Sequence, residues 1–216
     1  MMTLYVYDHC PYCVRARMPL GFKGIDYTLE TMLNDDIDTP TDLVGKKIVP
    51  ILTKEDGTHM AESMDIVHHI DQNFGEPMFN GPTDLPELQA WISQYHRLTS
   101  RLLIPRCVRA PFAEFATQGG RDYFTNAKQL GDFADVLAAA PQERTEMSAG
   151  LAELEGLLHS EASAGPSLSD VDVDLFGKLR GITLVKGLVY PSKVRAYLEY
   201  MSERSDVPLL DEYAEA

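Results

Sequence analysis

The chain has few cysteines, few basic residues and no long apolar run, and each shortage excludes a class of protein. Three cysteines in 216 residues are too few, and odd in number, for a disulfide-built scaffold. The 33 acidic and 19 basic side chains give a formal charge of −14, which opposes binding to nucleic acid or to an anionic membrane surface. No apolar run approaches a membrane span, and the first residues lack the features of a secretory signal. We therefore expect a cytoplasmic protein with neither a nucleic-acid nor a membrane partner.

The first 74 residues alternate between strand and helix patterns. Residues that favour a pleated surface predict strands, and apolar residues three or four apart predict helices. The expected strands span 3–7, 26–31, 48–53 and 58–61; the expected helices follow Pro11 (closed by Gly21 and Gly24) and span 39–44 and 63–73, the last with Ser63 as its N-cap. This order, βαβ then α then ββα, predicts an α/β domain whose first two strands are parallel.

The remainder of the chain carries no strand pattern. Residues 75–86 are rich in glycine and proline, as in a linker between domains. Apolar spacing beyond it predicts helices around 88–102 (closed by Pro105), 130–137, 147–158, 175–182 and 194–201. An S-x-x-D box at 169–172 predicts the start of a core helix and a role in folding. We therefore expect an α/β domain over 1–74, a linker over 75–86 and an all-helical domain over 87–216.

Cys10 and Cys13 form a C-x-x-C pair where the first strand gives way to the first helix. Zinc is disfavoured, because one such pair supplies only two ligands and no second pair fits except the adjacent His68 and His69, which point apart on a helix. A structural disulfide is disfavoured in a reducing compartment. A redox role fits better. Cys10 at a helix N-terminus is favoured as a thiolate and nucleophile, Pro11 suits the first helical position, and Cys13 one turn on can resolve a mixed disulfide.

The motifs CPYC at 10–13, VP at 49–50 and ES at 62–63 resemble those of a glutaredoxin, and the helical remainder resembles the C-terminal domain of glutathione transferases. With YDHCPYC, LNDD at 33–36, VPIL at 49–52 and ESMDIVH at 62–68, the whole chain resembles the two-domain bacterial glutaredoxins of the glutaredoxin 2 family. The similarity is looser in the second half, at PR (105–106), ITLVKG (182–187) and the following YPS. It implies a thioredoxin-like N-terminal domain, a glutathione transferase-like helical domain and glutathione-dependent thiol–disulfide oxidoreductase activity.

The resemblance also implies a glutathione site. It assigns the backbone of Val49, before a cis Pro50, to the cysteinyl residue of glutathione, and Ser63 at a helix N-terminus to the γ-glutamyl carboxylate. It assigns Glu62 to the γ-glutamyl ammonium and Tyr12 to the flank of the peptide. The plainer alternatives are an edge-strand proline at 50, a surface charge at 62 and simple packing at 12.

The resemblance further implies glutathione as the reducing co-substrate, disulfide-containing or glutathionylated proteins as partners, no metal, a monomer, and a role in electron transport and cell redox homeostasis. Two other functions stay open: a glutathione transferase that conjugates electrophiles, and a non-enzymatic binding partner. We expect Arg15 and Arg17 to lie on a solvated helix face, His9 to point away from Cys10, and Cys107 to be an inert, half-buried thiol.

Overall fold

Four strands near the N-terminus form a mixed sheet in the order β2–β1–β3–β4 in the computed structural model, which describes residues 1–215. The central strand β1 (Met2–Val6) runs parallel to β2 (Tyr27–Thr31) and antiparallel to β3 (Ile51–Thr53), and β3 pairs with the antiparallel edge strand β4 (His59–Ala61). The four strands lie where the sequence patterns predict them, although β3 and β4 are shorter.

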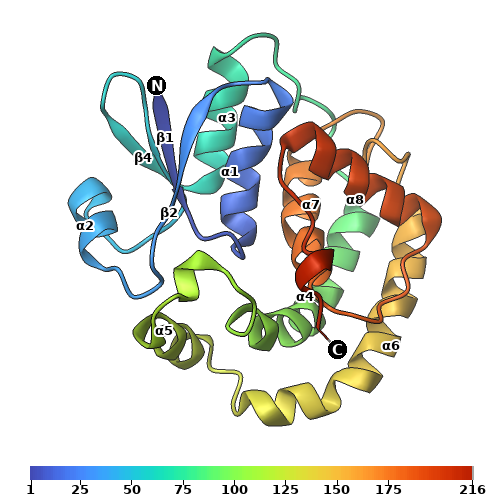
Figure 1. Cartoon of the computed structure of the whole chain (residues 1–216). Coiled ribbons are helices and arrows are strands. Elements are labelled where there is room, and N and C mark those ends of the chain that lie inside the picture. The colour runs from blue at the N-terminus through green and yellow to red at the C-terminus, as the bar shows by residue number, and fades with distance from the viewer. Residues whose placement is uncertain (216) are drawn as a thin grey trace.

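Three helices accompany the sheet: α1 (Pro11–Phe22), α2 (Asp38–Val44) and α3 (Ser63–Asn73). The helices α1 and α3 stand side by side against the sheet, and α2 lies apart from them near the sheet edge (Figure 1). Apolar side chains of β1, α1 and α3 share one buried cluster, which includes Leu4, Leu20 and Ile66. The thioredoxin-like order expected for this part of the chain is confirmed.

The rest of the described chain is helical, as expected. It comprises α4 (Pro86–Cys107), η1 (Ala113–Phe115), α5 (Gln118–Lys128), α6 (Phe133–Leu157), α7 (Asp170–Ile182), α8 (Ser192–Ser205) and η2 (Asp211–Tyr213). The largest buried cluster joins α4, α6, α7 and α8 to Val14, Met18 and Phe22 of α1, so one core continues from the helices into the sheet-bearing part. Within residues 1–215, none of the helices is both long and apolar enough to cross a bilayer.

Three helix predictions in the second half are wrong in detail. Pro105 lies inside α4, which continues to Cys107. Since only two residues of the helix follow this proline, its missing N–H and its ring disturb few of the helical hydrogen bonds. The helices expected at 130–137 and 147–158 are one helix, α6, which passes through Pro141. The helix α5 was not expected, because few of its residues are apolar and it carries two glycines near its start.

The S-x-x-D box begins α7 as predicted. Ser169 Oγ accepts the Val171 N–H at 3.2 Å, and the Asp172 carboxylate accepts the Ser169 N–H at 2.9 Å. Asp172 is fully buried and also accepts the N–H of Ala164 (2.6 Å) and the hydroxyl of Tyr197 (3.2 Å). The box therefore joins a preceding loop and α8 to the start of α7, which is a role in folding.

Gly21 does not close α1 but lies inside it, where α1 meets α8. A Cβ at this position would lie 1.9 Å from the backbone oxygen of Ser205, so only glycine permits the observed approach. The turn after α1 is instead made by Gly24, whose φ of 61° is unfavourable for other residues. These contacts leave the N-terminal end of α1, at Cys10, facing the segment between α4 and α5 (Figure 1).

Candidate active site

Cys10 is the N-cap residue of α1, with extended backbone angles (φ −80°, ψ 121°), and Pro11 follows at the first helical position. Its own N–H donates to the Tyr7 carbonyl at 3.2 Å, which fixes the turn between β1 and α1. The Cys10 side chain is partly exposed, whereas Cys13, one turn along, is buried. All three cysteines are free thiols.

The pKa values of the two thiols are shifted in opposite directions. The hydrogen bond from the Cys13 thiol lowers the pKa of Cys10 to about 6 from its ordinary 9.0; the charge of His9 and the N–H groups of Cys13 and Tyr12 add to this effect, and burial opposes it. Burial raises the pKa of Cys13 well above its ordinary value, and the hydrogen bond with Cys10 raises it further. The pair therefore combines an accessible thiolate with a protonated thiol that stabilises it, the arrangement that thiol–disulfide exchange requires.

Cavities open on two sides of Cys10. One, of about 280 Å³, lies between the start of α1 and the helices α4, α5 and α7, and Tyr12 lines it. The other, of about 220 Å³, lies between Val49 and α5. His9, Phe124 and Lys128 line both cavities together with Cys10. The sulfur of Cys10 can thus be approached by two different groups at once.

Val49 and Tyr12 line different cavities beside Cys10. The Val49–Pro50 peptide bond is cis, as the resemblance implies, and among residues 1–215 the main-chain groups of Val49 have no hydrogen-bond partner. Tyr12 is 52% exposed, and the Arg15 guanidinium lies 4.6 Å from the centre of its ring. A peptide lying in the Val49 cavity would meet these free backbone groups, whereas Tyr12 lines the other cavity beside Cys10.

The start of α3 differs from the expectation in one respect. Glu62, not Ser63, is the N-cap residue, and its backbone has an unusual φ of 71°. Ser63 is the first helical residue and is buried, and among the described residues its hydroxyl and the N–H groups of 63–65 have no acceptor. The Glu62 carboxylate meets the ammonium of Lys46 at 3.0 Å on the surface. A helix N-terminus with free donors and an adjacent ion pair suits a group that carries both a carboxylate and an ammonium.

His9 is buried between the two parts of the chain, and its ring faces Glu114. Its backbone N–H donates to Glu114 Oε1 at 3.0 Å, and its ring Nδ1 lies 2.7 Å from the same oxygen. His9 is 8% exposed and Glu114 is 0% exposed. Glu114, in η1, was not a candidate, because an isolated glutamate between helices carries no sequence signal of its own.

Arg15 and Arg17 do not form the solvated helix face that we expected. The Arg15 guanidinium pairs with Asp174 of α7, and Arg17, which is buried, meets Asp8 at 2.9 Å. Arg180 of α7 also reaches Asp8, at 3.0 Å from its side chain, and donates to its carbonyl. The residues directly before Cys10 are therefore held by charged side chains of the helical region.

Cys107 is completely buried rather than half-buried, and burial raises the pKa of its thiol far above the ordinary value. It lines the larger cavity beside Cys10, yet a thiol that stays protonated is a poor nucleophile. Within residues 1–215, no three side chains among histidine, cysteine, aspartate and glutamate are grouped to hold a metal ion.

Comparisons with known proteins agree with this geometry. Residues 87–214 match the family model "Glutaredoxin 2, C terminal domain", and residues 4–78 match "Glutathione S-transferase, N-terminal domain". The chain is 41% identical over 215 residues to Glutaredoxin 2 of Escherichia coli K12, covering 99% of this chain and 100% of that protein.

Solved structures are similar over nearly the whole chain. A crystal structure of Glutaredoxin 2 from Salmonella typhimurium, in complex with glutathione, has a TM-score of 0.96 and 38% identity, covering 100% of this chain and 99% of that one. A glutathione S-transferase from Rhodospirillum rubrum has a TM-score of 0.64 at 19% identity, covering 97% and 90%, a similarity of fold alone.

Proposed function

Because the chain belongs to the glutaredoxin 2 family, we propose that it reduces disulfides at the expense of glutathione through the dithiol of Cys10 and Cys13. It is a glutathione-dependent thiol–disulfide oxidoreductase, similar over its whole length to proteins of that name. The catalytic assignment is best supported by the opposite shifts in the pKa values of the two thiols. The pKa of Cys10 is lowered to about 6, mainly by the hydrogen bond from Cys13, and the pKa of Cys13 is raised.

The reaction begins with attack of the Cys10 thiolate on one sulfur of the substrate disulfide. A new S–S bond forms to Cys10, and the other substrate sulfur leaves as a thiolate and takes up a proton. Attack by Cys13 on this mixed disulfide releases the second substrate thiol and leaves a Cys10–Cys13 disulfide, which two glutathione molecules reduce in turn as they become oxidised glutathione. Where the mixed disulfide is with glutathione, a second glutathione thiolate can attack it instead. Resolution by glutathione on a glutathionylated enzyme gives oxidised glutathione and restores the Cys10 thiolate, so glutathione supplies the two electrons.

Glutathione would lie in the cavity between Val49 and α5. The free main-chain groups of Val49, next to Pro50, can pair with the cysteinyl residue as an added strand does, which brings its sulfur toward Cys10. Tyr12, exposed at the start of α1, can flank the peptide from the other side of the thiol.

The γ-glutamyl group would lie at the start of α3. The Ser63 hydroxyl and the free N–H groups of the first turn suit its carboxylate, and Glu62 suits its ammonium, with Lys46 as the present partner of Glu62. This assignment makes Glu62 and Ser63 binding residues rather than parts of the chemistry.

We extend the proposal to domains and setting. Residues 1–74 would form the domain that carries the dithiol, and residues 75–86 would be the linker. Residues 87–216 would be the helical domain that closes the cavities over Cys10. The natural substrates would be disulfide-containing or glutathionylated proteins. The enzyme would act as a monomer in the cytoplasm, where free thiols such as these persist. Sedimentation at working concentration tests the oligomeric state.

Serine variants of the two cysteines test the catalytic assignment. Cys10→Ser should lose all reduction of a glutathionylated peptide and of a protein disulfide, because the nucleophile is gone. Cys13→Ser should keep the first activity, which needs one thiol, and lose most of the second. Turnover would be followed by NADPH oxidation in an assay coupled to glutathione reductase. A Cys10→Ser enzyme that still turns over would contradict the assignment.

A conjugation assay separates the competing activity. If the double variant Cys10→Ser, Cys13→Ser conjugated glutathione to chlorodinitrobenzene at the rate of the unchanged protein, the dithiol would be incidental and the protein a transferase. We expect the double variant to show no such activity above the uncatalysed rate.

A further inference from the structure

His9 and Glu114 form a buried pair that joins the segment before Cys10 to the region between α4 and α5. The two residues are 105 positions apart, and one carboxylate oxygen of Glu114 accepts both the His9 backbone N–H (3.0 Å) and a hydrogen bond from the ring at Nδ1 (2.7 Å). Neither of the two catalytic cysteines contributes to this contact. It is an interaction between the helical region and the loop that carries the nucleophile.

The pair is buried, and its surroundings are aromatic. The His9 ring lies 4.9 Å from the rings of both Phe115 and Phe124, and it stacks on Tyr7 at 5.9 Å. The second oxygen of Glu114, Oε2, is buried and has no hydrogen-bond partner within residues 1–215. A carboxylate in such a place is costly unless a cation lies near it. The His9 ring touches it, and the buried guanidinium of Arg180 interacts with it through charge, although the hydrogen bonds of Arg180 go to Asp8 and Pro208.

The pair lies next to the reactive sulfur. His9 directly precedes Cys10 in the chain and lines both cavities at which Cys10 is open. After the hydrogen bond from Cys13, the charge of His9 is among the causes that lower the pKa of the Cys10 thiol. The negative charge of Glu114 acts in the opposite sense on neighbouring thiols, where it adds to burial in raising the pKa of Cys13 and of Cys107. Glu114 can therefore favour the Cys10 thiolate only through His9.

Other charged groups near the thiol are already engaged or lie on the cavity rims. Arg180 and Arg17 bind Asp8, and Arg15 binds Asp174. The remaining titratable side chains that line the two cavities are Lys47, His96 and Cys107 of α4, Tyr12, Tyr123, Lys128 of α5 and Lys178 of α7. Tyr7, which stacks on His9, stays neutral because burial raises its pKa.

We propose that Glu114 holds the His9 ring as an imidazolium, and that this buried cation stabilises the Cys10 thiolate. His9 and Glu114 are thus positioning residues, and the helical region takes part in the reactivity of a thiol carried by the sheet-bearing region. The inference rests on the proposed role of Cys10 as the nucleophile. It also gives a role to a carboxylate that is completely buried in η1.

The pH dependence of Cys10 alkylation by iodoacetamide tests this proposal. His9→Gln should move the midpoint up by about one pH unit, so that alkylation at pH 5 slows about tenfold, with the plateau rate at pH 10 unchanged. A general loosening of the loop would instead change the rate at every pH. His159→Gln, an exposed histidine far along the chain, is the matched control and should leave the profile in place. An unmoved midpoint in His9→Gln overturns the proposal.

A double-mutant cycle distinguishes the roles of the two partners. Glu114→Gln should raise the midpoint in the presence of His9, because the imidazolium loses its counter-ion. In the His9→Gln background the same change should lower the midpoint, since only the repulsion between carboxylate and thiolate is left to remove. Equal effects in the two backgrounds would overturn the coupling.

Two further measurements keep the test decisive if His9→Gln does not fold. The double variant His9→Gln, Glu114→Gln replaces the ion pair with two neutral amides, and its midpoint should also rise. In the unchanged protein, ¹⁵N chemical shifts should show a proton on His9 Nδ1, the atom that faces Glu114, and a ring without a proton on Nδ1 would overturn the proposal. If Cys10→Ser kept full turnover, the proposed function itself would fail, which is a separate result.

Discussion

Among single residues, the proposed chemistry depends on the difference in pKa between the thiols of Cys10 and Cys13, which lie within one helical turn. The lowered pKa of Cys10, about 6, has the hydrogen bond from the Cys13 thiol as its largest cause. Cys13 in turn is buried, and its sulfur accepts the N–H of Tyr7 at 3.4 Å. The helix N-terminus adds the N–H groups of Tyr12 and Cys13. In the proposed reaction, Cys13 would both lower the pKa of the nucleophile and resolve its mixed disulfide.

This arrangement predicts the pH profile of the thiol. Only the thiolate reacts with iodoacetamide, so alkylation of Cys10 should be fast above its pKa and should fall as the pH drops through about 6. In Cys13→Ala the donor is lost, and the midpoint should rise above about pH 7, toward the ordinary 9.0. Mass spectrometry of the modified peptide identifies the site. A Cys13→Ala profile with an unchanged midpoint would assign the low pKa to the helix N-terminus instead.

The residues of the dithiol were predictable from the sequence, and their charged neighbours were not. C-x-x-C at a strand-to-helix junction carries its chemistry in adjacent positions, so Cys10 and Cys13 can be found without a structure. His9 is adjacent too, but its role depends on Glu114, whose position relative to His9 is set by the packing of η1 against the loop. No local pattern encodes a contact of that kind.

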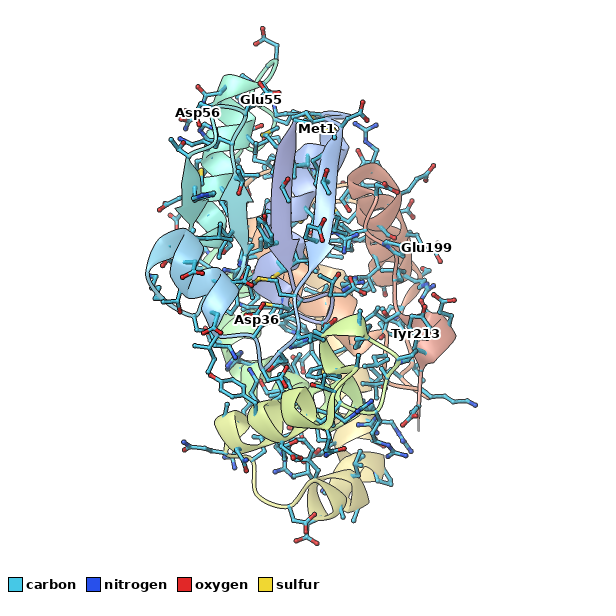
Figure 2. The ribbon with its side chains drawn as sticks, turned by 60° about the vertical axis from the view of Figure 1, so that its left-hand side comes forward. Met1, Asp36, Glu55, Asp56, Glu199 and Tyr213 are labelled. Carbon is cyan, nitrogen blue, oxygen red and sulfur yellow. The ribbon has the colours of Figure 1, made fainter. Side chains whose placement is uncertain are left out.

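At the scale of elements, local signals succeeded where they were strong. The S-x-x-D box begins α7 as predicted, and the alternation of strands and helices up to α3 is confirmed. The LNDD motif at 33–36, quoted only for its resemblance, proves to contact the helices: Asp35 accepts the Thr117 hydroxyl at 2.9 Å, and the Asn34 N–H donates to the Glu114 carbonyl at 2.8 Å. Figure 2 shows Asp36 at this boundary, close to α5. The sequence did not predict α5, because few of its residues are apolar.

Gly21 gives the sharpest prediction for an element. Gly21→Ala would bring a Cβ to 1.9 Å from the Ser205 backbone oxygen, so α8 must move away from α1, and we expect a loss of about 3 kcal/mol in the free energy of unfolding. Gly156→Ala is the matched control, because it lies exposed in α6 with no atom near its Cβ position. It should stabilise the protein by about 0.5–1 kcal/mol. Urea denaturation measures both, and equal effects would contradict the close packing.

At the scale of the whole molecule, the site is shared between the two parts of the chain. Figure 2 shows Met1, Glu55 and Asp56 at the end away from α5. Cys10 lies at the start of α1, where Glu114 of η1 and Arg180 of α7 bind the residues directly before it. The two family-model matches, over 4–78 and 87–214, each cover one part. The sequence motifs predicted both parts and the family. They did not predict that Glu114 and Arg180 of the second part bind the residues just before Cys10.

Arg180 tests the joint between the two parts. It is 1% exposed, binds the Asp8 carboxylate at 3.0 Å and donates to the Pro208 carbonyl at 2.8 Å. Arg180→Ala removes one partner of a mostly buried pair, and we expect a loss of about 3 kcal/mol. Arg195→Ala, which breaks pairs with Glu199 and Asp211 at the surface, should cost about 1 kcal/mol or less. Thermal unfolding compares the two, and equal shifts would contradict the role given to Arg180.

The most direct test of the central claim is to trap the mixed disulfide with glutathione. The Cys13→Ser protein, which cannot resolve the adduct internally, would be treated with oxidised glutathione at pH 7 and analysed by peptide mass spectrometry. We predict one glutathionyl group, attached to Cys10, and none attached to Cys107. An adduct on Cys107, or no adduct at all while the protein remains folded, would contradict the assignment of Cys10 as the nucleophile.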